Sequence, residues 1–137
     1  MRRFLAALFF LTLAACAPQQ AASPPARDGL AAVTVFFDTG SDELSLVASA
    51  ALERAAERMR ADPALRGRIE GYADSRGNAA DNIVLSNRRA QAVRDFLTAR
   101  GIAAGRLAVV AMGEAGGGPG AAVVAEAFER RVVLRLE

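Results

Sequence analysis

The segment from Ile69 to Leu97 constrains the fold more than any other part of this chain, because it predicts a strand, a polar loop and a long helix in succession. The strand ends at Tyr72, and Asp74 follows in the loop. Within the helix, four residues are spaced so that they share one stripe: Asn82, Leu85, Ser86 and Arg89. Helical side chains lean toward the helix N-terminus, so this stripe points back toward the loop that carries Asp74.

Asp74 and Arg89 form the first candidate site. A carboxylate accepts from an ammonium group, and a guanidinium donates to a carboxylate in a fork, so the two together suit a zwitterionic ligand. A structural alternative stays open, in which Asp74 caps the helix and Arg89 is a helix-surface residue joined to it by a salt bridge. The two carboxylates Asp38 and Asp74 lack any pocket signature of a glycosidase, so we expect binding and not an enzyme.

The flanking sequence predicts a small α+β domain. Strands are expected over residues 32–37, 67–72, 107–112 and 130–136, and helices over 46–61, 79–100 and, as a short element, 121–128. The first helix has Ser45 as its N-cap, and its predicted apolar stripe is Val47, Ala48, Ala51, Leu52, Ala55 and Met59. Elements in this order predict a two-layer sandwich, with helices packed on one face of a mixed sheet.

The N-terminal region indicates export. Residues 2 and 3 are arginines and residues 4–15 are apolar, a run too short to span a hydrocarbon core that needs ~20 residues, so residues 1–15 are predicted to be a signal peptide. Cys16 follows small residues as in a lipoprotein cleavage site; the alternative is an ordinary secretory signal with a chance cysteine. Residues 16–30 then form a lipidated, Pro- and Ala-rich tether, and residues 31–137 form the domain.

Charge and composition exclude several classes of function. Arg2 and Arg3 account for the whole net charge of +2, so the remainder of the chain is balanced. No basic patch with interleaved aromatic residues is present, which argues against a nucleic-acid partner. With no histidine and one cysteine, the chain has neither a familiar zinc site nor an intramolecular disulfide, and we expect no metal and no cofactor.

A longer pattern carries a resemblance to a known family. Gly71-Tyr72-Ala73-Asp74 with Gly77, followed by Asn82, Leu85-Ser86 and Arg89-Ala90, resembles the OmpA C-terminal-like family of peptidoglycan-binding domains, and within it the branch of peptidoglycan-associated lipoproteins. Further matching segments are Phe36-Phe37-Asp38, Met112-Gly113-Glu114 and Arg130-Arg131-Val132, so the resemblance runs from about Val33 to the C-terminus. The chain departs from the family at Tyr72-Ala73, where His-Thr or His-Ala is usual, at Glu129, where an Asn is usual, and in the glycine- and alanine-rich segment 115–128.

The resemblance implies a β-α-β-α-β-(α)-β order and a set of site residues. Arg89 is expected to bind the carboxylate, and Asp74 the ammonium, at the D-centre of meso-diaminopimelate in the peptide stem. Asn82 is expected either to contact the stem or to cap the start of the helix, and Leu85 to form the pocket floor. Phe37, Asp38 and Thr39 are expected to form the other wall, although Asp38 equally fits an Asx turn. One arginine of the Arg130-Arg131 pair is expected to be structural.

The sequence therefore supports two hypotheses for the function. The first is an outer-membrane lipoprotein, facing the periplasm, that binds peptidoglycan noncovalently and tethers the membrane to the cell wall. In this hypothesis, Arg89→Ala or Asp74→Ala abolishes retention on cell-wall sacculi without unfolding the domain. The second is a protein-interaction lipoprotein on the same fold, whose pocket is degenerate because Glu129 competes for Arg89 or the glycine segment blocks it. Its partners are expected to be envelope proteins of the Tol type or of a secretion or motility assembly.

Overall fold

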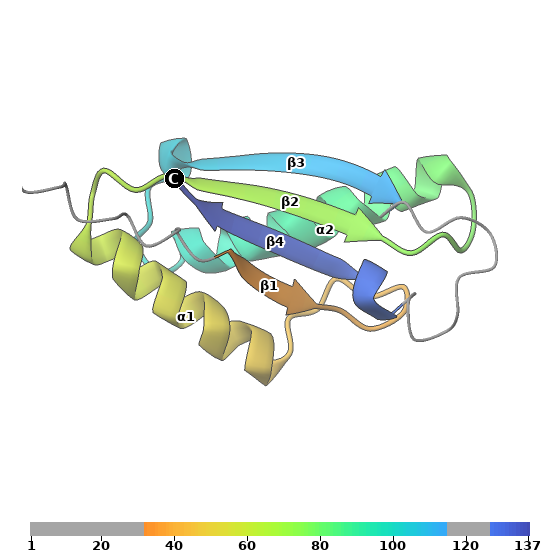
Figure 1. The fold of residues 1–137 in the computed structure, drawn as a ribbon, viewed down its shortest axis with the longest axis horizontal. Helices are drawn as coiled ribbons and strands as arrows, with labels where there is room; N and C mark the ends of the chain where they lie inside the picture. Colours follow the sequence, from red (N-terminus) through yellow and green to blue (C-terminus); the bar gives the residue numbers. More distant parts are fainter. Residues whose placement is uncertain (1–31, 115–126) are drawn as a thin grey trace, which may run out of the picture.

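The computed structural model describes residues 32–114 and 127–137. They form β1 (Val33–Phe36), α1 (Leu46–Ala61), β2 (Gly67–Ala73), α2 (Ala79–Thr98), the 3-10 helix η1 (Ala104–Arg106), β3 (Leu107–Glu114) and β4 (Arg131–Leu136) (Figure 1). The predicted fold class and element order are confirmed, and residues 127–129 are helical ahead of β4. The predicted signal peptide, Cys16, the tether and most of the predicted helix 121–128 lie outside the described residues. Among the helices of the described ranges, none has the length and apolar character needed to cross a membrane.

The sheet is mixed and has the strand order β1-β4-β2-β3. The C-terminal strand β4 lies between β1 and β2 and is antiparallel to both, whereas β2 and β3 are parallel and are connected through α2. Because β2 and β3 run in one direction, their C-terminal ends meet at the same end of the sheet. Asp74 follows β2 directly, and Glu114 closes β3 there.

Helix α1 begins where the sequence predicts. The Ser45 side chain accepts a hydrogen bond from the amide of Ala48 at 3.1 Å, which satisfies one of the free N–H groups of the first turn. The predicted place of Val47 in the core is wrong, because its side chain is 81% exposed. The buried residues of α1 recur as Ala48, Leu52, Ala55, Ala56 and Met59, and Val47 lies one residue off the start of that stripe.

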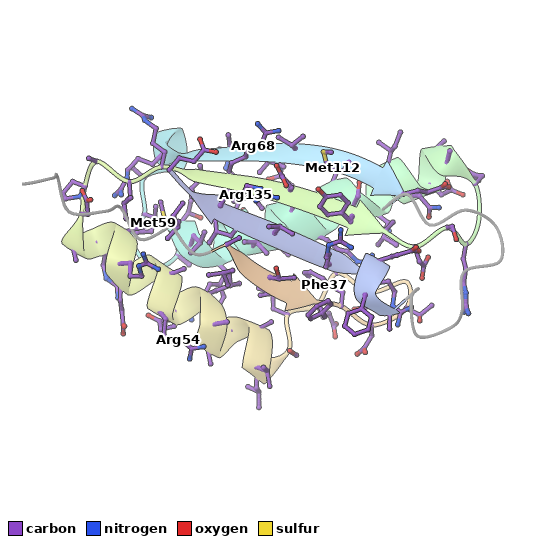
Figure 2. All side chains as sticks on the ribbon, in the orientation of Figure 1. Phe37, Arg54, Met59, Arg68, Met112 and Arg135 are labelled. Carbon is purple, nitrogen blue, oxygen red and sulfur yellow. The ribbon has the colours of Figure 1, made fainter. Side chains whose placement is uncertain are left out.

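The core fills the space between the helices and one face of the sheet. Its fully buried side chains include Leu52, Met59, Ile69, Val93, Leu97, Val132 and Leu134. Helix α2 lies so close to β2 that a Cβ added at Gly71 would stand 2.0 Å from the main-chain oxygen of Ser86. The opposite face carries Arg68 and Arg135, which both pair with Glu70 (Figure 2). A glycine in β2 therefore sets how closely the helix that carries Arg89 approaches the sheet.

Candidate functional site

Arg89 is the buried centre of the site. Its side chain is 0% exposed, and each of its three nitrogens donates to a main-chain carbonyl: Nε to Ser41 at 2.8 Å, Nη1 to Tyr72 at 3.0 Å and Nη2 to Asp38 at 3.0 Å. The guanidinium also lies 5.4 Å from the centre of the Phe37 ring. Arg89 thus joins α2 to the loop after β1 and to the end of β2.

Asp74 pairs with Arg130 and not with Arg89. The Arg130 Nη1 lies 3.3 Å from the Asp74 Oδ2, and the two side chains are 15% and 7% exposed. Arg130 is held in place on both sides of Phe37: its Nε donates to the Phe37 carbonyl at 3.3 Å, and its own carbonyl accepts from the Phe37 amide at 2.9 Å. The alternative of an Asp74–Arg89 salt bridge is therefore wrong, and of the two arginines before Val132 it is Arg130 that reaches the site.

The N-cap of α2 is a different residue from those predicted to form the site. Asn78 is the N-cap, so neither Asp74 nor Asn82 caps the helix. Asn82 is buried, and its Nδ2 donates to the Glu114 Oε1 at 3.1 Å, which joins α2 to the end of β3. The Ser86 hydroxyl accepts from the Gly113 amide at 3.1 Å. The stripe predicted from the spacing is real, and here it fastens the helix to the end of the sheet.

The charges of the site act on one another. Burial lowers the pKa of the Arg89 guanidinium, the Asp74 carboxylate acts in the opposite direction, and the neighbouring Arg130 adds to the lowering. An arginine stays charged at any pH that a protein meets, so the Asp74 carboxylate lies near two permanent cations, Arg89 and Arg130. Asp42 and Arg88 act on the pKa of Arg89 more weakly and in opposite directions.

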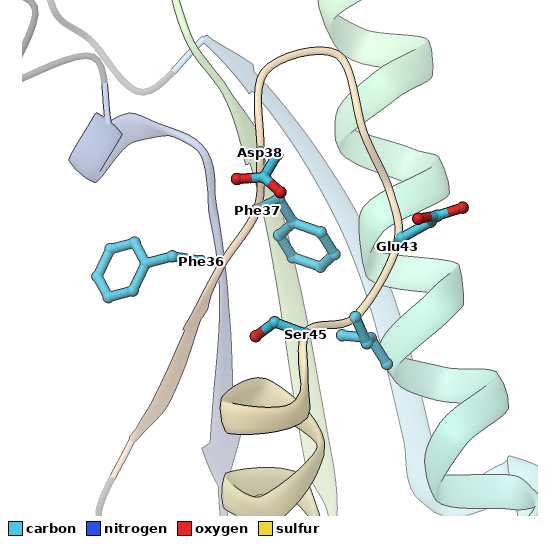
Figure 3. Close-up of a pocket in the computed structure, with 6 residues that line it drawn as sticks. Phe36, Phe37, Asp38, Glu43 and Ser45 are labelled. Atoms are coloured by element: carbon cyan, nitrogen blue, oxygen red, sulfur yellow. The ribbon is translucent and has the colours of Figure 1, made fainter.

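A hollow of about 250 Å³ adjoins this cluster. It is lined by Phe36, Phe37, Asp38, Glu43, Leu44 and Ser45, between the end of β1 and the start of α1 (Figure 3). Phe37 lines the hollow, and its carbonyl accepts from the Arg130 side chain, so Phe37 connects the hollow to the charged cluster.

The remaining predicted residues lie around the turn and on α2. The Asp38 carbonyl accepts from the Ser41 amide at 3.1 Å and the Asp38 side chain is exposed, so the main chain, without an Asx contact, closes the turn. Thr39 is exposed in that turn, and Leu85 is half-buried on α2. Neither side chain takes part in the hydrogen bonds that the described residues form around Asp74.

Glu129 does not contact Arg89 by any hydrogen bond or ion pair within the described residues. Its side chain is 7% exposed, and its Oε2 has no hydrogen-bond partner in the described part of the chain. The nitrogens of Arg89 are instead committed to carbonyls. Competition between Glu129 and a ligand for Arg89 thus finds no support in the geometry.

The comparisons with known proteins place this fold in a known family. The model of the OmpA family matches residues 36–123, so the chain belongs to the OmpA family. Among curated proteins, the peptidoglycan-associated lipoprotein of Rhizobium meliloti is 39% identical over 80 residues, which is 58% of this chain and 46% of that protein. The peptidoglycan-binding protein ArfA of Mycobacterium bovis is 36% identical over 102 residues, covering 70% of this chain and 31% of that protein. The predicted resemblance is confirmed.

Solved structures agree on the fold. The peptidoglycan-associated lipoprotein of Burkholderia pseudomallei superposes with a TM-score of 0.72 at 28% identity, over 76% of this chain and 89% of that one. The C-terminal domain of Helicobacter pylori MotB gives a TM-score of 0.68 at 18% identity, over 77% and 84% of the two chains, and shows the fold alone. The match to the Rhizobium protein spans about half of that protein's length (46%). The membership of the OmpA family also bears out the prediction that the chain is not an enzyme.

Proposed function

We propose that this chain is an outer-membrane lipoprotein that binds peptidoglycan noncovalently through the diaminopimelate of the peptide stem and tethers the membrane to the cell wall. The observation that carries the proposal is the Asp74 carboxylate at the end of β2 in an OmpA-family domain, paired with Arg130 and close enough to Arg89 to raise its pKa. The names of the relatives, a peptidoglycan-associated lipoprotein and a peptidoglycan-binding protein, support the choice of ligand.

The chemistry of the cluster suits one end of diaminopimelate. That end carries an ammonium and a carboxylate on the same carbon atom. Asp74 accepts from the ammonium, and the arginine side of the cluster attracts the carboxylate. A ligand that lacks either charge leaves a partly buried group unpaired, and this provides selectivity. Phe37, Asp38 and Thr39 form one wall of the proposed site, and Leu85 and Asn82 form its α2 side.

The N-terminal region supplies the second attachment. Lipidation of Cys16 with more than one acyl chain gives stable membrane anchoring, which a single chain does not. Each domain then binds the wall weakly, and many copies in one membrane give strong adhesion through multivalency. The protein faces the periplasm in this arrangement.

The first test is retention of the full chain on sacculi that contain diaminopimelate. The Asp74→Asn variant keeps the side-chain shape and loses the charge, and we expect binding to weaken by roughly tenfold or more. Asp95→Asn, an exposed carboxylate elsewhere on α2, is the matched control and should bind as the wild type does. A folded wild-type protein that is not retained would exclude the proposal.

One observation favours the second candidate, an envelope protein-interaction module of the same fold. In the free protein Asp74 is already paired with Arg130, and Arg89 is buried beneath carbonyls. If this pair is permanent, the pocket is closed to the wall. This module would be supported by two results together: the folded wild type is not retained on sacculi, and the wild type and Asp74→Asn bind a purified Tol-type protein with equal affinity.

A further inference from the structure

The strand directions define two ends of the domain, and the chain enters at the end that lies away from the site. Strand β1 is antiparallel to β4, and β4 is antiparallel to β2, so β1 runs in the same direction as β2 and β3 (Figure 1). The segment that precedes Val33 therefore joins the domain where β1, β2 and β3 begin and β4 ends, which we call the tether end. Asp74 and Arg130 lie at the opposite end, where β2 ends and β4 begins.

A second hollow, of about 290 Å³, opens at the tether end. Three arginines line it, Arg66, Arg68 and Arg106, together with one carboxylate among the described lining residues, Glu137. Residues of β3, including Val110, add apolar surface to the lining. Guanidinium groups bind phosphate well, and apolar surface beside them suits a phosphate that is carried on an apolar group.

Two of these arginines are fixed in place with part of each side chain left to donate. Arg66 and Arg68 are both exposed. The main chain of Arg66 makes two hydrogen bonds with that of Glu137, each 2.9 Å long, and its Nη1 donates to the Gly105 carbonyl at 3.3 Å. The Arg68 Nε lies 2.9 Å from the Glu70 Oε1. Within the described residues the other side-chain nitrogens of both arginines donate no hydrogen bond, so they are available to a phosphate.

The acidic groups near the hollow do not cancel its arginines. Glu70 is shared between Arg68 and Arg135, so these three side chains keep one positive charge. The Asp62 carboxylate accepts from a main-chain amide of its own turn at 2.9 Å. With the two other arginines of the hollow, four arginines stand against three carboxylates, of which Glu137 is the third.

We propose that the tether end docks on the membrane that anchors the chain, and that Arg66 and Arg68 bind the phosphate groups of its anionic lipids. This inference rests on the proposed function, which places the lipid anchor on Cys16. Residues 17–32 separate Cys16 from β1 and span at most about 58 Å. The tether end is thus held at a high effective concentration near the lipid surface. An attraction of roughly fivefold for each arginine then populates the docked state, in which Asp74 is directed away from the membrane.

The test uses the full chain, extracted with its lipid from cell membranes and reconstituted in phosphatidylcholine vesicles with or without phosphatidylglycerol. Cys16 is the one cysteine of the chain and carries the lipid, so a fluorescent label reacts only with an introduced cysteine. Ala103→Cys places the label at the tether end, and Ala80→Cys places it at the start of α2, near the site; both positions are exposed. Energy transfer to a headgroup-labelled lipid reports the distance of each end from the membrane.

We expect transfer from the Ala103→Cys label to rise when phosphatidylglycerol is present, and to fall again when added salt screens the attraction. The Ala80→Cys label should show no such rise. Arg66→Gln combined with Arg68→Gln should lower the ratio of docked to undocked protein by roughly 10- to 30-fold on anionic vesicles.

A matched control removes the same charge elsewhere. Arg54→Gln combined with Arg88→Gln changes two exposed arginines, one on α1 and one on α2, and should leave the ratio within about twofold of wild type. Neither pair of changes should alter retention on sacculi, which also shows that the variants are folded.

Three results would contradict docking through this hollow. Equal transfer on neutral and anionic vesicles would overturn it, and so would equal losses in the two double variants, because attraction would then follow total charge. Protein that stays with neither kind of vesicle during flotation has no lipid anchor, and this would overturn the proposed function together with the inference. Anchored protein that fails to dock overturns the inference alone.

Discussion

At each end of the sheet, one arginine side chain donates hydrogen bonds to several main-chain carbonyls, but the two arginines have different surroundings. At the N-terminal ends of the parallel strands, Arg106 donates to the carbonyls of Met59, Asp62 and Leu65. At their C-terminal ends, Arg89 donates to the carbonyls of Ser41, Tyr72 and Asp38. Each arginine collects carbonyls that regular structure leaves without partners.

The difference lies in what surrounds each arginine. The side-chain hydrogen bonds of Arg106 within the described residues are all to carbonyls around the end of α1. Arg89 has the Asp74 carboxylate and a second cation, Arg130, close enough to act on its pKa. Ligand sites of sheets with parallel strands lie outside the C-terminal ends of those strands. A buried arginine is thus no sign of function by itself, and what distinguishes Arg89 from Arg106 is the partly exposed Asp74–Arg130 ion pair beside it.

The largest expected effect is on stability at Arg89. Arg89→Ala removes all three carbonyl contacts from a fully buried position and should lower the free energy of unfolding by about 3 kcal/mol or more. Arg106→Ala, at a half-buried position, should cost about 1–2 kcal/mol. Urea unfolding of both variants measures the difference. An Arg89→Ala variant as stable as wild type would contradict the scaffold role, and would restore the expectation that this change affects binding alone.

The next effect concerns two carboxylates of similar burial. Glu70 is 6% exposed and has Arg68, Arg135 and Tyr72 as partners, whereas Glu129, one residue before Arg130, has an Oε2 without a partner in the described ranges. Glu129→Leu should therefore raise the free energy of unfolding by about 1 kcal/mol, because an unsatisfied polar atom is removed. Glu70→Leu should lower it by about 1–2 kcal/mol, because two arginines are left facing each other.

Thermal and urea unfolding check the sign as well as the size of both changes. Stabilisation by Glu129→Leu would show that the native protein keeps an unsatisfied buried carboxylate beside Arg130, whereas the buried carboxylate in the middle of β2, Glu70, has its partners. Destabilisation by both variants to the same extent would contradict this distinction, and would mean that Glu129 has a structural partner.

The fold could be predicted closely because its signals are local. The N-cap Ser45 and the apolar stripe of α1 were enough to predict that helix. The prediction that Val47 is buried was wrong, because helix propensity and hydrophobicity do not show which side of the first turn faces the sheet. The sequence contained an indication that Arg89 is buried, since Arg89 lies on the same stripe of α2 as the apolar residues Val93 and Leu97. An arginine on a helix is usually exposed, however, so that signal carried little weight.

The pairing in the site could not be predicted. Asp74 and Arg130 are 56 residues apart, and they meet only because β4 is inserted between β1 and β2. Within the sequence, Arg130 and Arg131 are indistinguishable, and the direction of each side chain depends on where β4 begins. Long-range strand order, and not local chemistry, decides which arginine joins the carboxylate.

The smallest expected effect tests how far the site end extends through the sheet. Tyr72 is the single tyrosine of the chain, which has no tryptophan, so ultraviolet absorbance reports its ionisation alone. Its carbonyl accepts from Arg89 in the site, while its hydroxyl donates to Glu70 at 3.2 Å on the open face. Burial, followed by the Glu70 carboxylate, raises the pKa of Tyr72 above its ordinary value of about 10.

A pKa raised by folding gives a definite sign. The contribution of Tyr72 to stability is complete below about pH 10 and is lost as the pH rises through the higher pKa of the folded state, because the unfolded chain releases the proton first. Glu70→Leu should move the absorbance midpoint down toward the ordinary value, since it removes a raising charge, and Asp74→Asn should leave the midpoint unchanged. A shift of equal size in Asp74→Asn would mean that the two faces of the sheet titrate as one network, so that the charged site is not confined to the end of the strands.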